Sequence, residues 1–298
     1  MPHQRKGLAA GGALILVLAG VWMWWQLPSI VAGAVLHPAR TAVYRALPEG
    51  CVERSFPGHG ITLRGWMCSP AGPRRASLVY LHGIADNRAS GAGLISRFLR
   101  HGFEVVAYDS RAQGQSNGTV CTYGALEKID LQSVIAALEP GPVVLLGTSL
   151  GGAVALQAAV GEPRITAIVA AEVFSDLPAI IRHRVPLLPK PLLRKAVRMA
   201  GVQGGFDAES ISPLAAATEL HIPVLLIHGA DDHDTPPDHS RRVLAALRGP
   251  KRLIEVEGAG HNRSLGGDAV WRQIEEWLET VIAAADRQPT QERNVPRS

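Results

Sequence analysis

The most informative segment of the chain for its architecture is Val143-Val144-Leu145-Leu146-Gly147-Thr148-Ser149-Leu150-Gly151-Gly152. An apolar run of strand length ends in Gly-x-Ser-x-Gly-Gly, and small residues in a helical pattern follow from Ala153 to Val160. So tight a turn from strand to helix requires glycine on both sides of the serine. The Ser149 hydroxyl would then stand beside a helix N-terminus, whose N–H groups stabilise negative charge. The stretch therefore predicts a nucleophilic serine at the end of a buried strand.

Composition excludes several classes of protein. The chain has 298 residues, 47% of them apolar and 19% charged, with a formal net charge of +4. No run of basic residues is long enough to follow a phosphate backbone, so we expect no nucleic-acid partner. The three cysteines, Cys51, Cys68 and Cys121, form no Cys-x-x-Cys pair, which argues against zinc and thioredoxin-type chemistry. A Cys51–Cys68 bridge is conceivable, but buried free thiols are the favoured interpretation.

The N-terminal segment, residues 1–36, has the sequence pattern of a membrane anchor. Residues 7–36 carry no charge, and residues 7–27 alone are long enough to cross a bilayer as a helix. Arg5 and Lys6 precede this span, and a cluster of tryptophans at 22–25 closes it, as in a helix with its N-terminus in the cytoplasm. We therefore expect a single-pass anchor, with the catalytic domain outside the cytoplasm.

A cleaved signal peptide and a secreted enzyme are the alternative, because Ala32-Gly33-Ala34 resembles a cleavage site. Asn-x-Ser/Thr sequons occur at Asn117 and Asn262, and a glycan at Asn262 would obstruct the site described below. This favours a bacterial inner membrane and periplasm over a glycosylating compartment.

Residues 37–285 alternate between apolar strands and helices. Such a pattern predicts a mostly parallel, twisted sheet with helices on both faces, and ligands bind at the carboxyl ends of its strands. Residues 286–298 are polar and read as a disordered tail. The expected strands are 61–68 (antiparallel), 77–81, 104–108, 143–148, 165–171, 224–227 and 252–256, and the expected helices include 90–101, 123–138, 237–247 and 268–285.

Acids and a histidine follow the last two strands. The run His228-Gly229-Ala230-Asp231-Asp232-His233-Asp234-Thr235-Pro236 comes after one buried strand, and His261 stands on a glycine-flanked loop after the next. A serine hydroxyl is a weak nucleophile that needs a base, and the base needs an orienting acid. The chain therefore contains a serine, then an acid, then a histidine, and this order occurs in one large fold.

These motifs resemble those of the α/β-hydrolases, in particular the single-domain group that is Bem46-like and related to prolyl oligopeptidases. The resemblance covers roughly residues 78–278 and includes His-Gly at 82–83, Asp-x-Arg-x-x-Gly-x-Ser at 109–116, Gly-Thr-Ser-Leu-Gly-Gly at 147–152 and His-Gly-x-x-Asp-x-x-x-Pro at 228–236. It implies an α/β-hydrolase fold with a small cap at about 175–220, and a serine hydrolase without cofactor or metal.

Carried over position by position, the resemblance implies that Ser149 is the nucleophile, Asp232 the acid and His261 the general base. The N–H groups of Ile84 and Leu150 would bind the oxyanion. Asp231 and Asp234 are the less favoured candidates for the acid. Structural roles are expected for His82, for His228 within the sheet, and for a loop pair of Asp109 with Arg111; His233 and His239 indicate a metal site only weakly.

The cap region is basic, with no acidic residue from 177 to 206. Residues 190–200 could form an amphipathic helix, with apolar residues opposite Arg194, Lys195 and Arg198. Such a cap could face an anionic lipid surface and admit lipid-like or amphiphilic esters, or it could be a solvated face over an ordinary acyl pocket.

A carboxylic ester hydrolase is the function we expect, acting on a small-molecule ester. A peptidase, thioesterase or amidase on the same triad is the alternative. A non-catalytic binding protein is the third possibility, and the presence of Ser149, Asp232 and His261 together argues against it.

Overall fold

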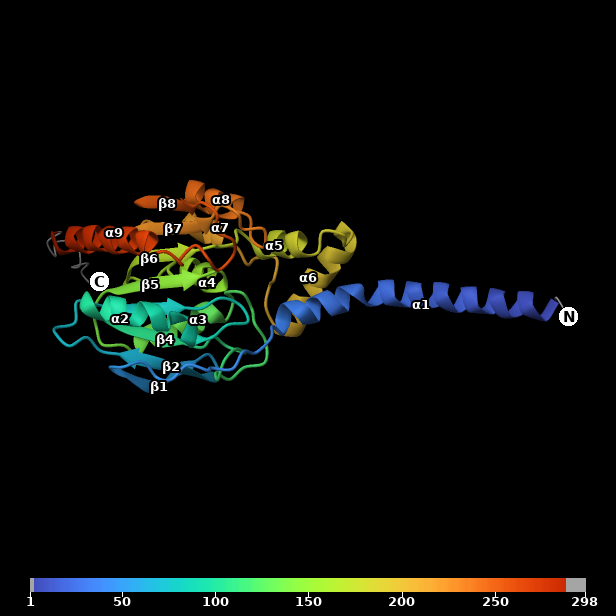
Figure 1. The fold of residues 1–298 in the computed structure, drawn as a ribbon, viewed down its shortest axis with the longest axis horizontal. Helices are drawn as coiled ribbons and strands as arrows, with labels where there is room; N and C mark the ends of the chain where they lie inside the picture. Colours follow the sequence, from blue (N-terminus) through green and yellow to red (C-terminus); the bar gives the residue numbers. More distant parts are fainter. Residues whose placement is uncertain (1–2, 288–298) are drawn as a thin grey trace, which may run out of the picture.

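The computed structural model describes residues 3–287, except for the side chains of residues 3–17, 19, 21 and 284–287. Within this part of the chain, one sheet of eight strands forms the centre of the molecule (Figure 1). Its strands are β1 (Cys51–Gly58), β2 (Ile61–Cys68), β3 (Ala76–Leu81), β4 (Phe103–Tyr108), β5 (Val143–Thr148), β6 (Ile165–Ala171), β7 (Val224–Gly229) and β8 (Lys251–Val256).

The strands lie in the order β1-β2-β4-β3-β5-β6-β7-β8. The pairs β1–β2 and β2–β4 are antiparallel and the other neighbours are parallel. The inner strands β3 to β7 are buried along their whole length or nearly so, which explains their continuous apolar sequences. The predicted mostly parallel sheet is confirmed.

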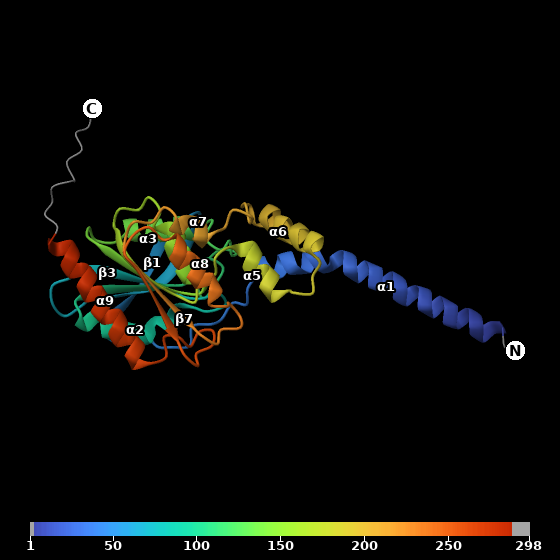
Figure 2. The same ribbon diagram turned by 90° about the horizontal axis from the view of Figure 1, so that it is seen from above.

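Helices cover both faces of this sheet, and others lie at one end of it (Figures 1 and 2). The helices of the described residues are α1 (His3–Leu36), α2 (Ala92–Arg100), α3 (Glu127–Ala136), α4 (Leu150–Ala158), α5 (Leu177–Arg184), α6 (Lys190–Gly204), α7 (Pro213–Ala217), α8 (Asp238–Ala246) and α9 (Asp268–Arg287), with a 3-10 turn, η1, at Arg88–Gly91. The apolar cluster on one face contains side chains of α2 and α9, and that on the other contains side chains of α3, α4 and α8. Helix α9 ends at Arg287, and most of the predicted tail, 288–298, lies outside the described residues.

Strand β1 and its disulfide correct two sequence-based interpretations. The sequence Cys-Val-Glu-Arg-Ser-Phe-Pro-Gly was not expected to form a strand, because it has no regular apolar pattern and contains the polar run Glu53-Arg54-Ser55. In the structure β1 is the outer strand of the sheet, and Cys51 lies opposite Cys68 of β2. The two sulfurs are bonded, so the favoured interpretation of free thiols is wrong for this pair. It is confirmed for Cys121, which is free and buried.

Helix α1 projects from one end of the domain, beside α5 and α6 (Figures 1 and 2). Its last turns are part of the fold: Ala32, Val35 and Leu36 are buried in the main core cluster, and α1 packs against α6. Farther out, the ammonium group of Lys195 lies 4.5 Å from the centroid of the Trp25 ring. The end of the predicted anchor is therefore packed against the cap.

No helix in the described part of the chain is both long and apolar enough to cross a membrane. The predicted span is residues 7–27, and most of its side chains are outside the described part of the structure.

Candidate active site

Ser149 stands at the turn between β5 and α4 in a strained backbone conformation, with φ of 50° and ψ of −113°. Neighbouring glycines make this turn possible. A Cβ atom on Gly147 would lie 2.4 Å from the carbonyl carbon of Gly151, and one on Gly151 would lie 2.1 Å from the carbonyl oxygen of Leu81. Both contacts are sterically impossible, so the two glycines permit the turn that holds the Ser149 hydroxyl at the strand end.

Three loops bring the predicted serine, acid and histidine together. The Nε2 atom of His261, on the loop after β8, lies 3.1 Å from the Ser149 hydroxyl oxygen. Its Nδ1 atom lies 2.7 Å from Oδ2 of Asp232, which follows β7. Both distances are within hydrogen-bond reach, so the three side chains form one hydrogen-bonded chain.

Asp232 is the acid that the structure places beside the imidazole. Its Oδ1 atom accepts the N–H groups of Asp234 and Thr235, at 3.0 and 2.8 Å. Burial favours the neutral acid, but hydrogen bonds from His228, His261 and the Thr235 N–H outweigh it, so the pKa of Asp232 is lowered. The carboxylate is therefore ionised at neutral pH. The other candidates, Asp231 and Asp234, have exposed side chains.

The environment of His261 suits a base that gains a proton during reaction. Burial alone lowers the pKa of this imidazole, but the hydrogen bond to Asp232 and that carboxylate's charge raise it. The charges of Glu172 and Asp234 act in the same direction, and the pKa of His261 is raised overall. The surrounding carboxylates thus stabilise the imidazolium form.

The two expected oxyanion donors are available. Among the described residues, the N–H groups of Ile84 and Leu150 have no hydrogen-bond acceptor. Leu150 is the first residue of α4, and Ile84 follows Gly83, where a Cβ atom would lie 3.6 Å from that of Ser149. Donors at a helix N-terminus and on a loop beside the nucleophile are the arrangement that oxyanion stabilisation requires.

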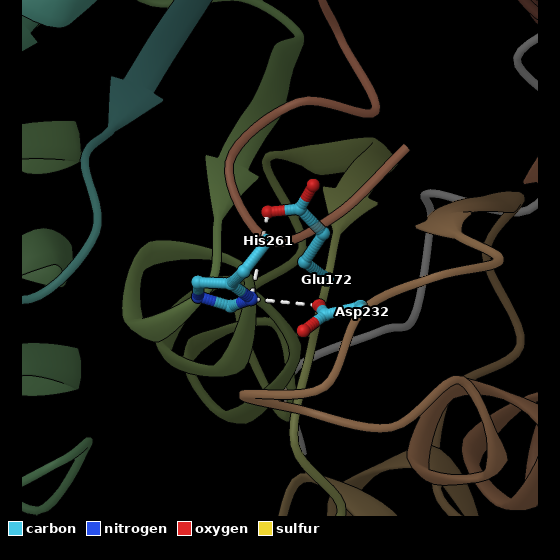
Figure 3. A group of neighbouring side chains, drawn as sticks. All are labelled: Glu172, Asp232 and His261. Atoms are coloured by element: carbon cyan, nitrogen blue, oxygen red, sulfur yellow. Dashed lines mark hydrogen bonds and ion pairs between the residues drawn. The ribbon is translucent and has the colours of Figure 1, made fainter. Parts of the chain in front are cut away.

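Glu172 was not anticipated from the sequence. It directly follows β6, is 1% exposed, and adopts φ of 57°. Its Oε2 accepts the N–H of Asn262 at 2.5 Å, and its Oε1 accepts that of Ser264 at 3.1 Å. Figure 3 shows Glu172 and Asp232 both pointing toward the Nδ1 side of His261, and Glu172 Oε2 lies 3.8 Å from Nδ1. Glu172 therefore holds the histidine loop, and a carboxylate directly after a buried apolar strand was the signal available in the sequence.

The three side chains in Figure 3 are also the one group among the described residues whose ligand atoms lie close enough to hold a metal ion. Their atoms already have other partners. Both ring nitrogens of His261 are within hydrogen-bond reach of triad side chains, and both oxygens of Glu172 accept backbone N–H groups. The arrangement therefore suits proton transfer better than metal coordination. His233 and His239 do not join: His233 is exposed, and Nδ1 of His239 accepts the Ser175 N–H.

Other histidines of the motifs have structural contacts. His82 Nε2 accepts the Ser110 N–H at 3.0 Å, and its Nδ1 lies 2.6 Å from the Gly83 carbonyl oxygen, which fits the expected role in turning the loop before Ile84. His228 differs from the expectation, because it bonds outside the sheet. Its Nδ1 lies 2.6 Å from the Ser240 hydroxyl, and its Nε2 lies 2.7 Å from the carbonyl oxygen of Thr235 and 3.3 Å from Oδ2 of Asp232, so it supports the loop that carries the acid.

The expected pair of Asp109 with Arg111 does not form. Asp109 is bound by Arg88, and Arg111 makes two hydrogen bonds to Asp130, at 2.7 and 2.9 Å. The partners that do bind, Arg88 on η1 and Asp130 on α3, lie outside the motif, so its spacing could not reveal them.

A cavity of about 300 Å³ opens beside Ser149. Its lining combines Ser149 and His261 with residues of the loops after β3 and β7 and with the end of α5. The lining residues are Ile84, Ser149, Arg184, Asp234, His261 and Asn262.

Comparison with known proteins identifies the family. The model of the alpha/beta hydrolase family matches residues 78–273, a range that contains most of the sheet as well as Ser149, Asp232 and His261. The chain belongs to the alpha/beta hydrolase family. It is 30% identical over 217 residues to the protein YqkD of Bacillus subtilis, covering 69% of this chain and 71% of YqkD. It is likewise 30% identical over 242 residues to YfhR of Escherichia coli K12, covering 75% and 78%.

Among solved structures, the fold is similar to that of an esterase from Pyrococcus furiosus, Pf2001, with a TM-score of 0.66 at 20% identity, covering 83% of this chain and 98% of the esterase. The expected membership of the α/β-hydrolases is thus confirmed, while the Bem46-like subgroup stays a prediction.

Proposed function

We propose that this member of the alpha/beta hydrolase family is a serine hydrolase that cleaves carboxylic esters through an acyl-enzyme. The observation that carries the proposal is the chain of hydrogen bonds from Asp232 through His261 to Ser149. The esterase activity named for the Pyrococcus furiosus structure belongs to that protein, and supports an ester substrate here only by likeness of fold.

The proposed reaction begins with proton transfer. His261 takes the Ser149 proton as the hydroxyl oxygen attacks the substrate carbonyl carbon, and Asp232 stabilises the imidazolium that forms. The N–H groups of Ile84 and Leu150 bind the oxyanion of the tetrahedral intermediate. His261 then protonates the leaving alcohol, which leaves an acyl group on Ser149. Water, deprotonated by His261, releases the acid and restores the serine.

Labelling with a fluorophosphonate tests this function, because the reagent reacts with an activated serine. We expect the wild type to be labelled, and Ser149→Ala and His261→Ala to be unlabelled. Hydrolysis of matched ester, thioester and amide substrates then decides between an esterase and the alternative activities. A folded wild type that is neither labelled nor active would remove the proposed function and favour a binding protein.

We also propose that the protein acts at a membrane, as a single-pass protein with its catalytic domain outside the cytoplasm. The uncharged sequence of residues 7–27 supports an anchor, and the Cys51–Cys68 disulfide supports an oxidising compartment such as the periplasm. The basic surface of α6, where Arg194 and Arg198 are exposed, supports contact with anionic lipid and an amphiphilic ester as substrate.

Fractionation of cells that carry the full-length protein tests this location. We expect the labelled protein in the membrane pellet at its full mass. A soluble product lacking residues 1–34 would instead indicate a secreted enzyme. For the lipid contact, charge reversal at Arg194, Lys195 and Arg198 is expected to weaken binding to anionic liposomes.

A further inference from the structure

The cap contributes one charged side chain to the catalytic cavity, and that side chain is Arg184. It is the last residue of α5, and it lines the same 300 Å³ cavity as Ser149 and His261. A neighbouring contact holds the end of α5 near the acid: the ring Nε2 of His183 lies 2.6 Å from the carbonyl oxygen of His233, next to Asp232. The position of Arg184 at the edge of the cavity is thus tied to the loop that carries the triad's acid.

The guanidinium of Arg184 has no hydrogen-bond or ion-pair partner among the described residues. Buried arginines of this protein, by contrast, are paired: Arg88 with Asp109, and Arg111 with Asp130. Arg184 is exposed, so water rather than protein solvates its donors. A guanidinium at a cavity rim with free donors can bind a carboxylate or phosphate, because its planar fork matches the oxygens of these groups.

The charges around Arg184 also favour the binding of a carboxylate or phosphate. No acidic residue occurs from 177 to 206, so α5 and α6 themselves carry only basic and neutral side chains. The acidic side chains of the cavity region lie on the loops after β6 and β7. Of these, Glu172 and Asp232 have hydrogen-bond partners, and Asp234 lines the cavity without forming an ion pair with Arg184 among the described contacts.

From this arrangement we infer that Arg184 forms a subsite for an anionic group of the substrate, a carboxylate or a phosphate carried at some distance from the scissile ester. The inference rests on the proposed function, and names the chemical class of ester within it. In this arrangement the scissile carbonyl is bound between Ser149 and the N–H groups of Ile84 and Leu150, and the anionic group is bound by Arg184.

Three methyl esters of similar length test the subsite: methyl hexanoate is neutral, monomethyl adipate is anionic, and methyl ε-aminocaproate is cationic. The measured quantity is kcat/KM for each ester, from acid release by full-length protein in a non-ionic detergent. We expect the wild type to prefer the anionic ester over the neutral one. We expect Arg184→Gln to lower that preference about five- to tenfold, in the upper part of the range for an ordinary hydrogen bond, and to leave the neutral ester nearly unchanged.

Arg184→Glu gives the sharper outcome, since it should reverse the preference toward the cationic ester. Arg182→Gln and Arg182→Glu are the matched controls: Arg182 is exposed on the same helix, the charge change is the same, and it does not line the cavity. These controls are expected to retain the wild-type preference. A parallel series with phosphonate-bearing esters shows whether a phosphate headgroup or a carboxylate is bound better.

The inference fails if Arg184→Gln leaves the anionic-to-neutral ratio unchanged, or if the Arg182 variants change it equally, which would indicate only a diffuse field. Equal losses on all three esters would also overturn it, because they would assign Arg184 to the oxyanion instead. Fluorophosphonate labelling of Ser149 in every variant separates these results from failure of the proposed function, in which no variant would be labelled.

Discussion

The Thr41 hydroxyl donates a 2.6 Å hydrogen bond to the carbonyl oxygen of Ala85. Thr41 belongs to the segment between α1 and β1, and Ala85 follows Ile84 on the oxyanion loop. Ala85 has φ of 57°, and its own N–H donates to Oε1 of the buried Gln113 at 2.6 Å. Two distant parts of the chain therefore hold the strained residue Ala85, one through its carbonyl oxygen and one through its N–H. Ala85 is adjacent to Ile84, a proposed oxyanion donor.

Replacing Thr41 by valine removes this hydrogen bond at constant shape. We expect kcat to fall about three- to tenfold, with little change in KM, because the loop that carries the Ile84 N–H loses one of its supports. Thr41→Ser restores the hydroxyl and should recover most of the rate. Equal kcat for the valine variant and the wild type would show that the loop holds its position without Thr41.

Glu172→Gln tests the support of the histidine loop. The amide keeps one acceptor but turns a nitrogen donor toward a backbone N–H, so one of the two hydrogen bonds is lost. We expect the free energy of unfolding to fall by about 1–3 kcal/mol, with a lower kcat. Urea denaturation and steady-state kinetics measure the two effects. Glu257→Gln, at an exposed position, is the control and should change neither.

The pH dependence of kcat/KM should report the raised pKa of His261. The base must be neutral to accept the Ser149 proton, so the rate rises with pH through this pKa, and the acid limb should lie above pH 6.5, the ordinary value for histidine. In Asp232→Asn the negative charge that favours the imidazolium is gone, so the limb should move to lower pH. Activity itself should fall by about 10⁴-fold, since the imidazole loses its orientation. A limb that moves to higher pH would contradict this assignment of charges.

The disulfide should stabilise the fold without serving the reaction. Cys51 and Cys68 lie at the antiparallel edge of the sheet, whereas Ser149 follows the central strand β5. The bridge closes a loop with a sequence separation of 17 residues, so the double variant Cys51→Ser/Cys68→Ser should lose about 3 kcal/mol of stability and retain its kcat. A reducing agent should lower the melting temperature of the wild type and leave that of the double variant unchanged; equal sensitivity would argue against the bridge.

Two N-terminal truncations should show that the last turns of α1, but not its first part, stabilise α6. A chain without residues 1–17 keeps the contacts of Trp25 and Ala32, so the cap helix α6 should be protected from hydrogen exchange as in the full-length protein in detergent. A chain without residues 1–34 loses the buried Ala32 and the Trp25–Lys195 contact, and α6 should exchange faster. Equal protection in both shortened chains would show that α1 does not stabilise the cap.

Strands buried on both faces could be predicted closely. The expected strand at 165–171 has the bounds of β6, because its sequence is apolar throughout and a buried parallel strand needs no alternation. The helix expected at 123–138 proved shorter, Glu127–Ala136, because Tyr123 and Gly124 adopt positive φ and form a turn. Strand β1 escaped prediction because an outer strand with exposed polar side chains carries no apolar pattern.

The turn at Ser149 could be predicted from local residues, since the two glycines limit the backbone path between a strand and a helix, and the order of serine, acid and histidine is read directly from the chain. The contact of Asp232, rather than Asp231 or Asp234, with His261 became evident from the folded chain. The tertiary structure also decided the contacts of Glu172 and Arg184, because these depend on where separate loops meet at the carboxyl ends of the strands. Hydrogen bonds across such distances in the chain follow from strand order and helix packing, which no local pattern of residues records.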